Sequence, residues 1–79
     1  MKALANRRRL VSLRIIKQQK EISVGDLAEQ LKLSFKATSK HLAVLTGAGI
    51  LDKEQRSSQM FFSISQYLPE AAKRIISLL

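Results

Sequence analysis

The stretch LKLSFKATSKHLAVLTGAGI, residues 31–50, decides the fold. Ser34 is a good helix N-cap, because its hydroxyl can accept a hydrogen bond from a backbone N–H of the first turn. The offsets 0, +3, +4 and +7 that mark one buried helix face are occupied by Thr38, His41, Leu42 and Leu45. We therefore predict a helix over residues 35–48, and Gly49 is the better candidate for its left-handed cap.

The opposite face of this helix carries short or cationic hydrogen-bonding groups, namely Lys36, Ser39 and Lys40. A short turn, residues 31–34, joins the helix to a preceding one of about eight residues, which starts at Ser23 with a pattern like a capping box. This is the spacing of a helix-turn-helix, in which the later helix enters the major groove of DNA.

Three further elements flank this pair of helices. Asn6 caps a helix predicted over residues 7–18, whose apolar face carries Leu10, Val11, Leu13, Ile15 and Ile16. Ile22 can supply a strand of one or two residues. Residues 51–64 predict a β-hairpin around a basic tip, and Pro69 suits the first turn of a last helix. The order predicts one domain over residues 1–79, mainly α with a small β-hairpin (α+β), a winged helix-turn-helix.

Composition narrows the functions that fit such a domain. Fourteen Lys and Arg against six Asp and Glu give a net charge of +8, which favours a polyanionic partner. The absence of cysteine excludes disulfides and thiolate chemistry, and no nucleophile–base pair or Gly-rich phosphate loop suggests an enzyme or a cofactor. No apolar run approaches the ~18 residues of a membrane span, so we expect a cytoplasmic protein with no membrane partner.

The assembled pattern resembles the ArsR family of bacterial and archaeal repressors. The most specific piece is Ser39-Lys40-His41-Leu42-Ala43-Val44-Leu45 followed by Ala48-Gly49-Ile50-Leu51, where the family has Ser-x-His-Leu-x-x-Leu and then Ala-Gly-Leu-Val. The resemblance implies a homodimeric transcriptional regulator that binds a DNA operator with dyad symmetry.

Two metal sites of that family have no counterpart in this sequence. Ser23 and Gly25 stand where the thiol-dependent sensors have cysteines, and neither is a soft ligand. The other site uses carboxylates and His on the last helix, where this chain has only Glu70. We therefore expect no metal.

Candidate DNA-contacting residues lie on the third helix and at the hairpin tip. Lys40 is expected to read a base or a phosphate, Lys36 to meet phosphate, and Arg56 to contact phosphate or the minor groove. Phe35 either packs back onto the core, which we favour, or contacts a thymine methyl group. The full set of candidates is Ser34, Lys36, Ala37, Ser39, Lys40, His41, Arg56, Ser57 and Ser58.

The last helix, residues 68–79, carries a clean apolar stripe. The stripe can cover the domain's own core or pair with a second copy, and we favour a twofold dimer interface, with residues 1–5 as a further candidate. The alternative function for such a fold is a module that binds protein or RNA. The predicted interface residues are Leu68, Ala72, Ile75, Ile76 and Leu79.

Overall fold

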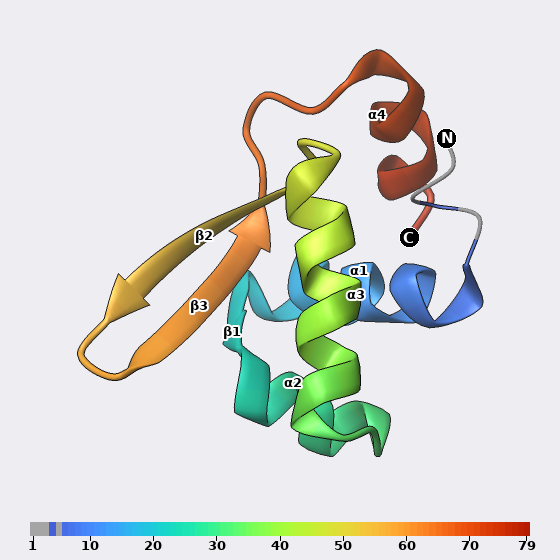
Figure 1. The fold of residues 1–79 in the computed structure, drawn as a ribbon. Coiled ribbons are helices and arrows are strands. Elements are labelled where there is room, and N and C mark those ends of the chain that lie inside the picture. The colour runs from blue at the N-terminus through green and yellow to red at the C-terminus, as the bar shows by residue number, and fades with distance from the viewer. Residues whose placement is uncertain (1–3, 5) are drawn as a thin grey trace.

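The computed structural model describes residue 4 and residues 6–79. The order of its elements confirms the predicted winged helix-turn-helix fold. Within the described residues no helix is both long and apolar enough to cross a bilayer. Apart from residue 4, the suggested contribution of residues 1–5 to a dimer lies outside the described residues. The elements run in the order α1 (Arg7–Gln19), β1 (Glu21–Ser23), α2 (Val24–Leu31), α3 (Phe35–Gly47), β2 (Leu51–Arg56), β3 (Gln59–Ile64) and α4 (Glu70–Ser77) (Figure 1).

Side-chain caps start the first three helices where the sequence predicts them. Asn6 Oδ1 accepts from the backbone N–H of Arg8 at 2.9 Å, and Ser23 Oγ accepts from that of Asp26 at 3.2 Å. Ser34 Oγ caps α3 in the same way, 3.0 Å from the backbone nitrogen of Ala37. Such bonds satisfy N–H groups that have no partner within the helix, so they fix where each helix begins.

The three strands form an antiparallel sheet in the order β1-β3-β2. Phe62 at its centre pairs with Ile22 on one side and with Lys53 on the other, so these three side chains share the inner face. By the same alternation Glu54 and Arg56 lie on the outer face. The two residues of the hairpin turn, at positions 57 and 58, project beyond the paired strands (Figure 1).

The core lies between the inner face of the sheet and the helices. Its fully buried side chains include Leu13 and Ile16 from α1, Leu27 from α2, and Leu42 and Leu45 from α3. The sequence-based assignment of α1 needs one correction. Val11, expected on the apolar face, is 42% exposed, whereas its neighbour Ser12 is buried and its Oγ donates to the Arg8 carbonyl. A small side chain at this position lets α1 approach its neighbours closely.

The last helix packs on the domain's own core more than the sequence predicts. Ala72 is fully buried and Ile76 is 5% exposed, so neither has surface left for a partner copy. The prediction of these two as dimer contacts is therefore wrong, because one stripe of α4 closes the core of a small domain. Lys17 of α1 adds to this packing by donating from Nζ to the Ile76 carbonyl at 2.8 Å. Leu78 remains 83% exposed.

Candidate nucleic-acid interface

One face of α3 forms an exposed cationic stripe. Lys36, Lys40, Ala43 and Gly47 recur at offsets of 0, +4, +7 and +11, and all four are exposed. The helix contains no acidic residue. Ala43 and Gly47 are too small to hold a partner away from the helix axis, while the two lysines extend beyond them. The stripe is therefore suited to close approach by an anionic surface such as the edge of a DNA groove.

The other predicted residues of α3 border this stripe. Ser34 is exposed at the N-cap, where its Oγ accepts the capping bond and its hydroxyl proton remains able to donate. Ala37 and Ser39 are half-buried beside the lysines. Ser39 faces the hairpin, since it lines a groove together with Lys53 of β2.

Phe35, the first residue of α3, does not pack into the core. Its side chain is 63% exposed and lies beside Val24 and Met60 at the edge of the groove between α3 and the hairpin. The favoured interpretation, that it packs back onto the core, is wrong. Side chains tilt toward the N-terminus of a helix, so the ring of the first residue projects beyond the elements that cover Leu42.

His41 is half-buried on α3, among positive charges. Its Nδ1 is buried and has no hydrogen-bond partner in the part of the chain that the structure describes. Burial, followed by the charges of Arg9 and Arg8 on α1 and of Lys40 on α3, lowers the pKa of the imidazole below its ordinary 6.5. The ring is thus neutral at pH 7, and the three cationic side chains around it mark a positive region where α1 and α3 meet.

The lowered pKa of His41 predicts that acid destabilises the domain before its carboxylates titrate. As the pH falls below about 6.5, the imidazole takes up a proton in the unfolded chain but not yet in the folded one, so the free energy of unfolding decreases. We expect a lower melting temperature at pH 5.5 than at pH 7.5, measured by circular dichroism. His41→Gln should flatten this difference, and an equal difference in the variant would contradict the assignment.

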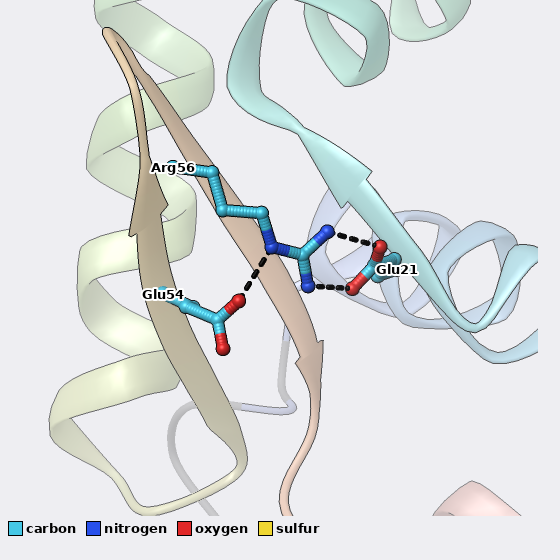
Figure 2. A network of polar contacts seen from close by, with 3 residues as sticks. All are labelled: Glu21, Glu54 and Arg56. Atoms are coloured by element: carbon cyan, nitrogen blue, oxygen red, sulfur yellow. Dashed lines mark hydrogen bonds and ion pairs between the residues drawn. The ribbon is translucent and has the colours of Figure 1, made fainter.

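Arg56 is held by a polar network on the outer face of the sheet (Figure 2). Its Nη1 and Nη2 donate to the two carboxylate oxygens of Glu21 at 2.6 and 2.7 Å, and its Nε donates to Glu54. The guanidinium also lies 4.8 Å from the centre of the Phe61 ring. These contacts lower the pKa of Glu21 and raise that of Arg56 further above its ordinary value, chiefly through the hydrogen bonds between them. The arginine therefore links β1 to β2 across the central strand.

The sequence places Arg56 at the hairpin tip, whereas in the structure it is the last residue of β2 and its side chain is directed to Glu21 (Figure 2). The turn itself consists of Ser57 and Ser58, with Ser57 at a φ of +55°. Both serines are exposed. Contact between Arg56 and DNA stays a prediction that requires the network to open.

Lys53 is a candidate that the sequence reasoning missed. It is exposed on the inner face of the hairpin and lines the same groove as Ser39 of α3. Leu51 is buried, and residues two apart in a strand share a face, so the alternation already placed Lys53 on the side of α3. The cation of the hairpin that faces α3 is thus Lys53, while Arg56 faces away.

Comparison with known proteins assigns this arrangement to a family. The sequence model of one family, the bacterial regulatory proteins of the arsR family, matches residues 6–53 of this chain. The matched segment runs from the cap of α1 into β2. The chain belongs to the ArsR family. As a member of it, this ArsR-family chain is a regulatory protein and not an enzyme.

Individual relatives are similar over most of this ArsR-family chain. It is 38% identical over 65 residues to the transcriptional activator HlyU of Vibrio cholerae serotype O1. The aligned segment covers 82% of this chain and 59% of HlyU. The chain thus spans less than two thirds of that relative. The structure of reduced HlyU from Vibrio cholerae superposes with a TM-score of 0.84 at 37% identity, over 99% of this chain and 78% of the other.

A homodimer is among the structures similar to this ArsR-family chain. It is the winged helix-turn-helix DNA-binding domain of a possible ArsR-family transcriptional regulator from Mycobacterium bovis. That domain superposes with a TM-score of 0.82 at 27% identity, over 98% of this chain and 68% of the other.

Proposed function

We propose that this domain binds double-stranded DNA in a sequence-specific manner and regulates transcription at the operator it occupies. In this proposal α3 enters the major groove and the hairpin turn lies against the sugar–phosphate backbone. The observation that carries the proposal is the exposed stripe of Lys36, Lys40, Ala43 and Gly47 on a helix without acidic residues.

We assign the contacts by chemistry. Lys40 and Lys36 meet guanine edges or phosphates, and Lys53 meets a phosphate from the side of the hairpin. Arg56 ties the hairpin to Glu21 and, where this network opens, contacts a phosphate or the minor groove. Hydroxyl, methyl and imidazole contacts are assigned to Ser34, Ala37, Ser39, His41, Ser57 and Ser58.

The proposal includes a homodimer on an operator with dyad symmetry. Two copies related by a twofold axis would present their α3 helices to successive major grooves, about 34 Å apart. The exposed Leu78 and the partly buried Leu68, Ile75 and Leu79 leave apolar surface on and beside α4 for the partner. The homodimeric relative from Mycobacterium bovis supports this arrangement.

The direction of regulation follows from where the operator lies. HlyU of Vibrio cholerae is named an activator, whereas repression is the mode that the resemblance to ArsR repressors implies. A domain that occupies DNA over a promoter excludes polymerase, so repression is our proposal for operators in that position.

Binding across a salt series tests the proposal. An operator is first selected from a random DNA pool, and its affinity is then measured by fluorescence anisotropy between about 50 and about 200 mM monovalent salt. If a dimer neutralises about six phosphates, the affinity should fall roughly a thousandfold over this range, because bound cations release the counterions of DNA. A flat response, or no selected sequence, would contradict the proposal.

An RNA-binding function is the second candidate, because exposed aromatic side chains can stack on unpaired bases. Tyr67 is 87% exposed and Phe35 63% exposed. Phe35 lines the groove beside Phe62 on the inner face of the sheet, whereas Phe61 lies under Arg56 on the outer face, so these two do not form one stacking platform. Competition between the selected duplex and an RNA of the same sequence separates the two functions.

A further inference from the structure

A mostly apolar groove runs between α3 and the β-hairpin. It encloses about 480 Å³, which is within the range of small-molecule sites. Val24 and Phe35 form one part of its wall, and Met60 and Phe62 of β3 form another. Among the described residues that line it, Lys53 is the only charged one.

The groove exists because α3 presents small side chains to the hairpin. Ser39, Ala43 and Gly47 line it from the helix. A Cβ added at Gly47 would meet no atom within 4 Å, so the space beside the helix is open and not filled by a neighbouring side chain. Larger residues at these positions would close the groove, whereas the buried core side chains of α3, such as Leu42, would stay in place.

The groove continues toward the hairpin turn. An adjoining hollow of about 260 Å³ shares Val24, Phe35 and Met60 with it and reaches Ser58. Because Phe35 is 63% exposed, its ring offers apolar surface to both hollows. A ligand of elongated shape can therefore extend along the apolar wall from Lys53.

The charge of the groove selects the class of ligand. Within the described residues Lys53 makes no ion pair, whereas Arg56 on the opposite face of the hairpin is neutralised by Glu21 and Glu54. One unpaired ammonium beside apolar walls favours a ligand with a single anionic group and an apolar body. A polyanion would lose the hydration of its other charges against Met60 and Phe62 without compensation.

We propose that this groove binds a small carboxylate with an aliphatic or arylalkyl body. The carboxylate pairs with Lys53, and the body lies along Phe35, Met60 and Phe62. Ala43 and Gly47 belong both to the groove and to the exposed stripe of α3, so the bound ligand would also weaken DNA binding. That consequence rests on the proposed function, whereas the ligand site itself does not.

Titration of the DNA-free protein tests the site. Decanoate, decan-1-ol and decyltrimethylammonium are added below micelle-forming concentrations, and amide shifts are followed by 1H-15N NMR. We expect decanoate to shift the amides around Val24, Ala43 and Met60 and to bind more tightly than the other two. Lys53→Gln should weaken decanoate about tenfold, the size of a charge-assisted contact, and leave decan-1-ol unchanged.

Two further variants make the test decisive. Lys73→Gln, on α4, removes the same charge away from the groove and should leave decanoate binding unchanged. Ala43→Phe should fill the groove and abolish binding of both decanoate and decan-1-ol while the rest of the spectrum remains native. Equal binding of decyltrimethylammonium and decanoate, equal losses in Lys53→Gln and Lys73→Gln, or shifts outside the groove would each overturn the site.

Adding the selected operator separates this proposal from the proposed function. Displacement of the DNA by decanoate supports the competition. Decanoate binding without displacement overturns the competition and leaves the site standing, whereas a protein that binds decanoate and no DNA refutes the proposed function alone.

Discussion

A Lys36→Glu/Lys40→Glu double variant is expected to bind its operator about a thousandfold more weakly than the unmodified chain. Both ammonium groups lie on the exposed stripe of α3, and a dimer places four of them against DNA. A contact of this kind contributes about 1 kcal/mol or more, so four lost contacts amount to about 4 kcal/mol, or about three factors of ten. Fluorescence anisotropy with the selected operator measures the change.

The matched control for this variant is Lys73→Glu/Arg74→Glu on α4, which changes the net charge by the same amount at two exposed positions. It should lose less than about tenfold, because only the long-range attraction is reduced. Equal losses in the two variants would mean that net charge, and not the stripe, accounts for binding. Lys40→Gln alone should relax the preference among operator sequences if Lys40 reads a base.

The boundaries of the first three helices could be predicted closely because their signals are local, whereas the last helix, predicted over residues 68–79, spans Glu70–Ser77. Ser23 and Ser34 each cap a backbone N–H three residues ahead, so the sequence itself contains both partners of the bond. Gly49 adopts a φ of +78°, which L-residues rarely occupy. Because glycine occupies this conformation without strain, its position in the sequence indicates where α3 ends. Little about these ends depends on distant parts of the chain.

Apolar spacing was a weaker guide to which side chains are buried. It grouped Val11 with Leu13 on one face of α1, but Ser12 occupies the buried position between them. On α4 it identified the stripe but not what covers it: Ala72 is fully buried within the domain. In both helices the outcome depends on how closely another element approaches, which no local pattern contains.

The candidate interface was predictable where a single helix face defined it and not where the hairpin did. Lys36 and Lys40 are exposed on α3 as the periodicity predicts. Arg56 was assigned by its nearness to the turn, although strand alternation from the buried Leu51 places it on the outer face. Its partner Glu21 is 35 positions away in the sequence, so only the packing of β1 on β3 reveals the ion pair.

Leu13→Ala is expected to lower the free energy of unfolding by about 3 kcal/mol, whereas Leu78→Ala should lower that of the monomer by less than about 0.5 kcal/mol. The chemical change is the same, but Leu13 is fully buried and Leu78 is 83% exposed. Removing a buried leucine loses its transfer free energy and leaves a cavity. A domain of this length has a total stability of about 4–12 kcal/mol, so the first variant loses a large share of it. Urea unfolding at low protein concentration measures both.

The same pair of variants tests the proposed dimer. Leu13→Ala changes the unfolding equilibrium of the monomer, whereas Leu78→Ala should change the dissociation equilibrium of the dimer. If the exposed side chain of Leu78 is covered by a partner copy, Leu78→Ala should raise the dimer dissociation constant about a hundredfold or more, since burial of a leucine contributes about 1.5–3 kcal/mol and a twofold dimer loses two of them. Sedimentation equilibrium measures that constant. An unchanged dissociation constant would remove Leu78 from the interface. If Leu78→Ala instead lowered the stability of the monomer as much as Leu13→Ala does, α4 would pack on the core through Leu78 as well as through Ala72 and Ile76.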